Sequence, residues 1–319
     1  MRMVLCCGPR FAGGARLKPA SRRATAIGLV FINLTWAAGY PAAAIALRDI
    51  PPDLLTLLRL GVSALLLLPL LRLPAGARWD RRAVLPAIAL GVLGFALPIY
   101  LQTLGLALSS PAMTAILVAL EPLLTAVIAG VLLRQPLPPL RRAALLIALV
   151  GAWIIAGLPR PGHAGYVAGY VLLVLSLVCF ATYNAFSARL TKRVPPMAAA
   201  GATLWVGFLA MIPLWLLLGA GLPRHVSVGP IAATAFLAIV GTGLAYVLWV
   251  AALDRMPAAE AAIYLYLQPV FGVLLSMALT GARPTLGFYA GATLVLLGVV
   301  LGAERSAGGG QPRAAEDTG

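Results

Sequence analysis

Two stretches of the sequence decide the fold. Residues 111–133 read PAMTAILVALEPLLTAVIAGVLL, and residues 257–280 read PAAEAAIYLYLQPVFGVLLSMALT. Each stretch is long enough to cross a bilayer as a helix, which takes about 20 mostly apolar residues. Each carries a single charged residue, Glu121 or Glu260, and a shift of 147 positions places Pro122 on Pro269. The two stretches therefore predict a membrane protein that contains a repeat.

The whole chain of 319 residues shares this composition. Hydrophobic residues make up 61% of it and charged residues 10%, and its mean hydropathy is +0.97. A soluble domain averages about 45–50% apolar and about 25% charged residues. Too few polar side chains remain here to cover a water-soluble globule. The composition excludes a soluble enzyme, a disordered protein and a coiled coil, and it predicts an all-α polytopic membrane protein.

Clusters of charge, proline and glycine divide the chain into ten apolar runs of spanning length. The runs lack the two-residue alternation of barrel strands, so we predict ten transmembrane helices. The predicted spans are 25–46, 53–71, 84–106, 111–133, 141–158, 165–188, 197–219, 229–251, 257–280 and 286–303.

The ten spans fall into two halves whose prolines and glycines correspond. The shift of 147 also places Gly94 on Gly241, and a shift of 144 places Pro51-Pro52 on Pro195-Pro196. Five spans per repeat, an odd number, force the two repeats into opposite orientations, as in many secondary transporters. We predict a basic cytoplasmic tail over 1–24, repeats over 25–158 and 159–303, and a disordered cytoplasmic tail over 304–319.

Charge predicts the orientation. The net charge is +15, from 24 Lys and Arg against 9 Asp and Glu. With the N-terminus in the cytoplasm, 19 of the 24 cations lie in cytoplasmic segments and 4 on the opposite side. The positive-inside rule then predicts a multi-pass protein of the inner (cytoplasmic) membrane with both termini cytoplasmic. The cations lie between apolar runs, not along one face, so nucleic acid is not an expected partner.

Four segments carry a family resemblance: Asn33 to Tyr40, Leu57 to Leu60, Glu121 to Leu124, and Gln268 to Phe271. They resemble the repeat of the EamA family of the drug/metabolite transporter superfamily, over nearly all of 25–303. The resemblance implies ten helices, cytoplasmic termini, a central cavity, and transport, usually export, of amino acids or related small metabolites. The family usually ends its fourth and ninth helices with Gly-Glu. The acid is missing at Gln135 and Ala282, so its role in closing a gate or pairing a loop is not carried over.

Ionisable residues inside spans are costly in lipid and are usually functional. Arg59 either attracts an anionic group such as a substrate carboxylate or snorkels toward the nearer interface. Glu260 lies beside Asp254 and Arg255, where an interfacial salt bridge is the simpler interpretation.

Glu121 is the predicted proton-coupling residue. It precedes Pro122, whose missing N–H bends a helix and leaves a carbonyl unpaired. Its carboxyl could couple transport to protons or accept a substrate ammonium. Because the equivalent residue in the second half is Gln268, a neutral hydrogen-bonding role is the open alternative.

Polar and aromatic residues recur at helical spacing along six of the predicted spans, so each set covers one face of its helix. Such faces avoid lipid and point into the bundle or a wet cavity, or else join helices by hydrogen bonds. Pro122 and Pro269 are predicted helix kinks. The predicted substrate-cavity residues are Asn33, Trp36, Tyr40, Arg59, Tyr100, Thr103, Thr114, Glu121, Asn184, Tyr246, Trp249, Tyr264 and Gln268.

The sequence predicts no metal, cofactor or catalytic site. It lacks a Walker-type loop, its three cysteines match no ligand spacing, and His163 and His225 lie in predicted outward loops. We therefore expect a secondary transporter, not an enzyme, with alternating access and protons as the candidate coupling ion. Export follows from the resemblance alone. An uptake permease for a sugar or nucleotide-sugar, a non-transporting receptor or assembly protein, and a homo-oligomer remain open alternatives.

Overall fold

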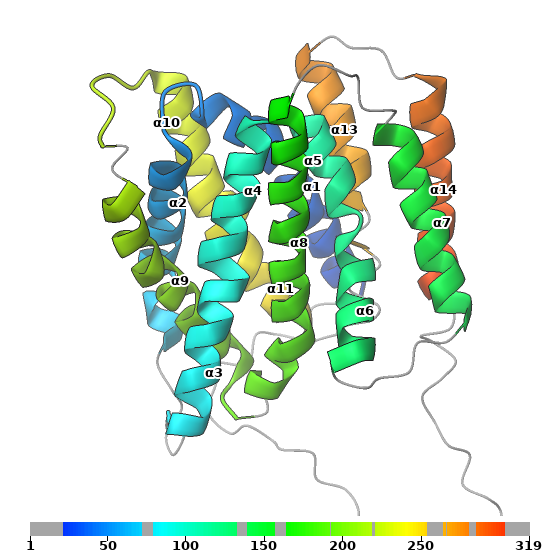
Figure 1. The fold of residues 1–319 in the computed structure, drawn as a ribbon. Helices are drawn as coiled ribbons and strands as arrows, with labels where there is room; N and C mark the ends of the chain where they lie inside the picture. Colours follow the sequence, from blue (N-terminus) through cyan, green and yellow to red (C-terminus); the bar gives the residue numbers. More distant parts are fainter. Residues whose placement is uncertain are drawn as a thin grey trace, which may run out of the picture.

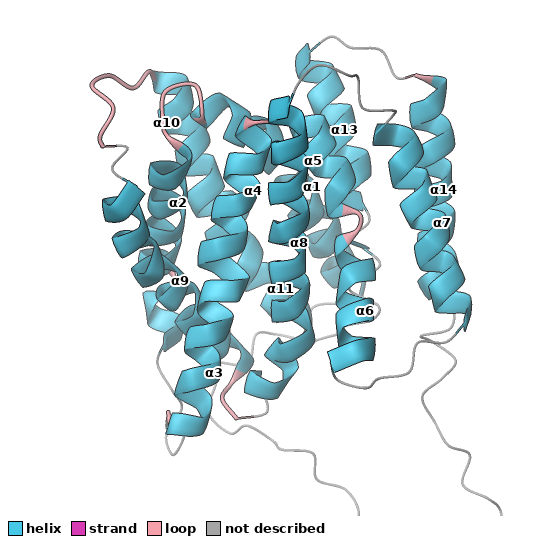
Figure 2. Cartoon of the chain, viewed as in Figure 1, coloured by secondary structure: helices cyan, strands magenta, loops and turns pink. Residues whose placement is uncertain are grey.

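The computed structural model describes residues 22–71, 79–132, 139–156, 164–191, 193–218, 221–253, 264–265, 267–280 and 285–303. All regular structure within these ranges is helical (Figure 2). Five helical runs among them are long and apolar enough to cross a membrane. They are Arg23–Ala46, Arg81–Ala107, Val167–Thr191, Pro196–Leu218 and Val228–Ala252.

Every predicted span coincides, in its described part, with one helix or with consecutive helices. The first half contains α1 (Arg22–Ala46), α2 (Pro52–Leu66), α3 (Arg81–Gly91), α4 (Leu97–Ala107), α5 (Pro111–Val118), α6 (Glu121–Leu132) and α7 (Pro139–Ala156). The second half contains α8 (Ala164–Thr191), α9 (Pro196–Leu218), α10 (Val228–Ala235), α11 (Ala245–Leu253), α13 (Leu267–Thr280) and α14 (Leu286–Ala303). The count of ten membrane crossings stays a prediction, because five of the ten predicted spans coincide with such long apolar runs among the described residues.

Two predicted spans are interrupted next to prolines. The span predicted over 53–71 leaves the α-helix at Leu66 and continues as a 3₁₀ turn over Leu68–Leu71, because Pro69 has no N–H and disfavours helical geometry before it. The span predicted over 111–133 breaks between α5 and α6. There Ala119 and Leu120 donate to carbonyls three residues back, since Pro122 offers no N–H for a regular turn.

Equivalent helices of the two halves run in opposite directions. In Figure 1 the chain rises from α3 to α4 and descends from α10 to α11. Both runs contain a π-helical segment at matching positions, Val92–Ala96 and Phe236–Leu244. Segments of this kind occur frequently at functional sites.

Close approach of small residues joins the halves. Gly105 of α4 meets Gly169 of α8, and a Cβ added to either would lie within 2.9 Å of the other's carbonyl oxygen. Small residues allow this backbone contact between helices in lipid. The last helices of the halves, α7 and α14, lie together at one edge of the bundle (Figure 1).

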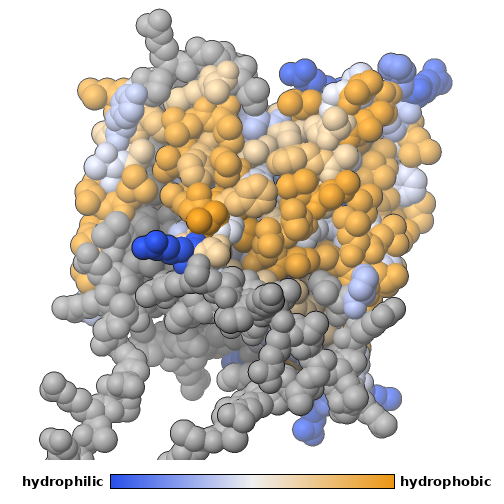
Figure 3. Space-filling model, turned by 180° about the vertical axis from the view of Figure 1, so that it is seen from behind, coloured by the Kyte–Doolittle hydropathy of each residue, from blue (hydrophilic) through white to orange (hydrophobic). Residues whose placement is uncertain are grey.

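The outer surface is apolar, and the upper end of the bundle is packed. In Figure 3 one face is largely orange, with blue residues along its upper edge. Large apolar side chains such as Leu217 and Leu286 are more than 80% exposed, as expected for a surface that meets lipid. Inside, a core cluster fills the end where α1 and α4 finish and α2 and α5 begin. Its members include Ala46, Ile50, Leu55, Leu106 and Ile116.

Candidate functional site

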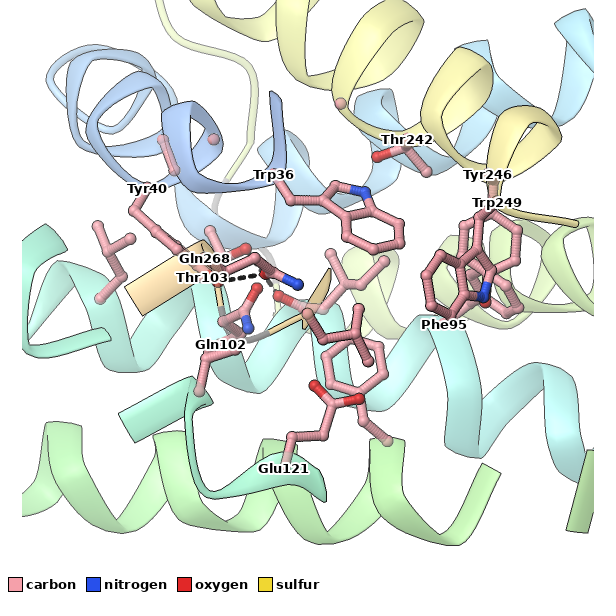
Figure 4. Close-up of a pocket in the computed structure, with 18 of the residues that line it drawn as sticks. Trp36, Tyr40, Phe95, Gln102, Thr103, Glu121, Thr242, Tyr246, Trp249 and Gln268 are labelled. Atoms are coloured by element: carbon pink, nitrogen blue, oxygen red, sulfur yellow. Dashed lines mark hydrogen bonds between the residues drawn. The ribbon is translucent and has the colours of Figure 1, made fainter. Parts of the chain in front are cut away.

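A cavity lies in the middle of the bundle, and Tyr40, Ala43 and Leu106 of the core cluster form its upper wall. Its volume is about 150 Å³, roughly ten times what a single water molecule needs. Nine of the thirteen predicted cavity residues line it: Trp36, Tyr40, Arg59, Thr103, Glu121, Asn184, Tyr246, Trp249 and Gln268. Figure 4 labels all of these except Arg59 and Asn184.

The cavity wall follows the repeat. Of its 23 residues, 16 form eight pairs that the shifts of 144 and 147 relate to each other. The pairs are Trp36 with Phe180, Gly39 with Tyr183, Tyr40 with Asn184, Phe95 with Thr242, Ile99 with Tyr246, Gln102 with Trp249, Val118 with Leu265, and Glu121 with Gln268. The two halves thus contribute the same helix faces to a shared cavity.

Two of these position pairs make the same hydrogen bond in opposite halves. The Tyr40 hydroxyl donates to Oε1 of Gln268 over 3.1 Å. The Asn184 amide nitrogen Nδ2 donates to Oε1 of Glu121 over 2.8 Å. In each case the first helix of one repeat bonds the residue that precedes the proline of the other repeat. The repeats are therefore joined at two symmetric places.

Asn33 stands behind the first of these contacts. The Gln268 amide nitrogen Nε2 donates to Oδ1 of Asn33 over 3.2 Å, and Asn33 Nδ2 donates to the Leu29 carbonyl over 2.7 Å. Asn33, Tyr40 and Gln268 are all at most 7% exposed. A buried polar network whose members are satisfied holds its side chains in fixed orientations.

Arg59 is anchored to the second π-helical segment. Its Nε donates to Oγ1 of Thr242 over 2.6 Å. One turn further along α2, the Ser63 hydroxyl contacts both the Arg59 and the Ala238 carbonyl oxygens at 2.7 Å. Ser63 thereby ties α2 to the π segment. Because a guanidinium carries five N–H donors, Arg59 keeps donors for an anionic group in the cavity.

Aromatic rings form the wall opposite the amides. Trp36 and Trp249 lie with ring centroids 5.6 Å apart. Phe95 contacts Tyr183 and Tyr246 at 5.5 and 5.0 Å. Figure 4 shows Phe95, Tyr246 and Trp249 on one side of the cavity and Gln102 and Gln268 on the other. The cavity therefore has a polar side and an aromatic side.

Four predicted cavity residues do not line the cavity, and their assignment is corrected. Asn33 lies behind Gln268, and the buried Thr114 hydroxyl donates to the Ser110 carbonyl. Tyr100 packs into a cluster with Leu60 and Phe95, and Tyr264 packs into another with Leu29 and Ile32. Helical spacing identified a shared face, but it does not say which neighbour that face meets.

The wall also contains residues that were not predicted, among them Phe95, Gln102 and Tyr183. The repeat itself held the signal for two of them. Phe95 and Gln102 are the equivalents of Thr242 and Trp249, which stand in the polar and aromatic stripe of the eighth predicted span. Tyr183 is the equivalent of Gly39, a residue type that gives no such signal.

The remaining predicted positions are placed as follows. Pro122 lines the cavity, and both Pro122 and Pro269 lie in the first turn of a helix, where proline is tolerated. Among the described residues no group of His, Cys, Asp and Glu is arranged to hold a metal ion. Several predictions fall outside the described residues, namely those on Glu260, Gln135, Ala282, His163 and both tails.

Comparison with known proteins gives consistent matches along the chain. A family model described as "EamA-like transporter family" matches residues 24–157 and again 167–302. A "Probable terminal-alkyne amino-acid exporter" from Streptantibioticus cattleyicolor is 28% identical over 288 residues, covering 88% of this chain and 93% of that protein. An uncharacterized transporter from Archaeoglobus fulgidus is 25% identical over 272 residues, covering 83% and 94%.

One solved crystal structure shares the fold. It matches with a TM-score of 0.64 at 21% identity, covering 90% of this chain and 99% of that one. Its likeness shows the architecture alone. The family model, in contrast, accounts for most of the chain in two consecutive copies, and it coincides with the duplicated cavity wall. This chain belongs to the EamA-like transporter family.

Proposed function

We propose that the chain is a secondary transporter that exports small polar metabolites, such as amino acids, across the cytoplasmic membrane by alternating access. The observation that carries the proposal is the make-up of the cavity, in which 16 of 23 wall residues form repeat-equivalent pairs. Halves of opposite direction that share one site can expose it to either side by the same rocking motion. Such a motion requires that both halves contribute equivalent residues to the wall of the shared site, as they do here.

The packed upper end of the bundle supports a state in which the cavity is closed to the outer side of the membrane. From the distribution of cations we infer that the upper end faces the outer side of the membrane. The core cluster and the buried Tyr40–Gln268 hydrogen bond then close the cavity to the outside. Release of substrate to the outside requires that α1 and α13 separate at this bond. The Asn184–Glu121 bond is the equivalent contact of the other half, and it leaves Asn184 exposed.

The charges of the wall favour a zwitterionic substrate. Arg59 and Glu121 are its charged residues. Thr242, which holds Arg59, and Glu121 lie at opposite sides of the cavity in Figure 4. A substrate carboxylate fits the guanidinium, whose fork of donors matches two oxygens, and a substrate ammonium fits the carboxyl. The printed name of the Streptantibioticus relative, an amino-acid exporter, agrees with this chemistry.

Glu121 is also the proposed coupling group. Asn184 holds one of its oxygens, which leaves the second oxygen to bind either a proton or the substrate ammonium. A site that holds one or the other exchanges protons for substrate. The alternative is that Glu121 serves as a neutral hydrogen-bonding group, as Gln268 does in the other half.

Efflux from proteoliposomes tests the proposal. Vesicles containing the purified protein are loaded with a mixture of radiolabelled amino acids and diluted into buffer with or without a pH gradient. We expect efflux of at least one amino acid above protein-free vesicles, accelerated by inward proton movement. Specific binding without flux would favour a receptor, and flux of sugars alone would favour the uptake permease.

A further inference from the structure

Gln102 differs from the uncharged polar residues that lie next to it in the cavity. It projects from α4 into the cavity and is partly exposed there. Its amide makes no hydrogen bond to any residue that the structure describes. The neighbouring polar groups are occupied, since the Thr103 hydroxyl donates to the Ile99 carbonyl and both ends of the Gln268 amide are bonded. With respect to the described residues, the amide of Gln102 thus offers an unpaired donor and an unpaired acceptor to the cavity.

The equivalent position in the second repeat is Trp249, which lies on the aromatic side. The same wall position therefore carries an amide in one half and an indole in the other. This difference makes the cavity asymmetric along the line from Gln102 to Trp249. A bound molecule must turn its polar part toward Gln102 and its apolar part toward Trp249 and Trp36.

A free amide discriminates strongly between ligands. An amide that is cut off from water without a partner loses about 1–3 kcal/mol. A ligand that fills the cavity but cannot hydrogen-bond Gln102 incurs this loss, whereas a ligand with a hydroxyl or amide at the same place does not. Sites of this kind reject the analogue that lacks the polar group far better than apolar pockets reject extra methylenes.

We propose that Gln102 is the specificity-determining residue of the cavity and binds a neutral hydrogen-bonding group on the variable part of the substrate. Resting on the function proposed above, this narrows the substrate class to amino acids with an uncharged polar side chain. The backbone carboxylate and ammonium of the substrate occupy Arg59 and Glu121. Its side-chain hydroxyl or amide then bonds Gln102, and its methylenes lie against Trp36.

Paired substrates of equal size test the inference. Competition by threonine against valine, and by asparagine against leucine, is measured on efflux of the labelled mixture from proteoliposomes. We expect the wild-type protein to prefer the polar member of at least one pair by tenfold or more. Gln102→Leu, which keeps the size and removes the amide, should reduce that preference at least tenfold, mainly by weakening the polar member.

Two further variants control for poor production of Gln102→Leu and for the general effect of removing a polar group. Gln102→Asn retains an amide and should keep a preference for the polar member even if Gln102→Leu is poorly produced. Thr182→Val removes a hydroxyl from α8 outside the cavity wall and keeps the size of the side chain, so it should leave the preference unchanged. An unchanged preference in Gln102→Leu overturns the inference while the proposed function stands. Absence of any amino-acid efflux by the wild-type protein overturns both.

Discussion

The two symmetric hydrogen bonds of the cavity show how the halves have diverged. Tyr40 and Gln268 form a neutral pair that is at most 7% exposed and is extended by Asn33. Asn184 and Glu121 form the equivalent pair with an acid, and Asn184 is exposed. The repeat therefore places an equivalent hydrogen-bonded pair, here called a joint, in each half: Tyr40–Gln268 is the neutral joint and Asn184–Glu121 is the acidic joint. The Tyr40–Gln268 pair is thus neutral and buried, whereas the Asn184–Glu121 pair carries an acid and is exposed at Asn184.

Exchange of the acid between the joints should have the largest effect. Glu121→Gln makes both joints neutral, and we expect it to lower efflux driven by a pH gradient at least tenfold, because no titratable group remains at the joint. Exchange of substrate for unlabelled substrate without a gradient should be affected less. The measurement is efflux from proteoliposomes at matched protein content.

Gln268→Glu is the matched control for this variant. It adds a second acid at the equivalent position and leaves Glu121 in place, so the response to the pH gradient should persist. Loss of that response in Gln268→Glu, with retention in Glu121→Gln, would contradict the assignment of the working half.

Two equivalent glycines offer a second contrast. A Cβ at Gly94 would lie 2.3 Å from the Tyr183 ring, whereas a Cβ at Gly241, which lines the cavity, would have the Phe236 carbonyl oxygen as its nearest neighbour, at 3.6 Å. Gly94→Ala should therefore lower the free energy of unfolding by about 1–3 kcal/mol through overpacking. Gly241→Ala should change it by less than about 1 kcal/mol, within what the gain in helix propensity can offset. Thermal unfolding in detergent compares the two, and equal losses would show that the halves are packed alike.

Removal of single donors tests the joints themselves. Tyr40→Phe leaves Oε1 of the buried Gln268 without its partner and should cost about 1–2 kcal/mol of folding stability. Asn184→Ala removes the donor of the exposed joint, where water replaces it, so a loss below about 0.5 kcal/mol is expected. A larger loss of folding stability in Asn184→Ala than in Tyr40→Phe would contradict the expectation that the buried pair contributes more than the exposed one.

The smallest effect concerns a contact at the upper end. Oδ2 of Asp49, which follows α1, accepts hydrogen bonds from the Ser227 N–H at 2.8 Å and hydroxyl at 2.5 Å, where α10 begins. The equivalent residues at the lower end, Arg193 and Asp80, are not paired in the described parts of the chain. The bonds from Ser227, with smaller contributions from His225 and Arg48, hold the pKa of Asp49 below its ordinary value.

A carboxyl with a lowered pKa in the folded state stabilises that state above its unfolded pKa of about 3.9 and loses this contribution as pH falls through the folded value. The wild-type protein should therefore unfold at a higher temperature than Asp49→Asn at pH 6. The difference should shrink as the pH falls below about 3.9, the ordinary value for an unfolded aspartate. A difference in unfolding temperature that stays constant over this range would remove Asp49 from the contact.

The sequence predicted those features of the fold and of the site whose pattern has a single physical cause. Run length and composition predicted helices at every described span, and the repeat related Glu121 to Gln268, which both line the cavity. The breaks at Pro69 and before Pro122 were predictable only as weak points, because a missing N–H does not tell where the chain re-forms its bonds. The π segments, the packing of Tyr100 and the burial of Thr114 depend on neighbouring helices, which helical spacing does not identify.

The most direct test of the account is the accessibility of one cavity residue from the two sides of the membrane. A single cysteine is placed at Ala119 in a chain whose three native cysteines are replaced, and an impermeant maleimide is applied to right-side-out and inside-out vesicles. We predict labelling from the cytoplasmic side without substrate, and a transported amino acid should raise labelling from the outer side as it lowers labelling from the inner side. Labelling from one side only, unchanged by substrate, would contradict a cavity that two inverted halves open in turn.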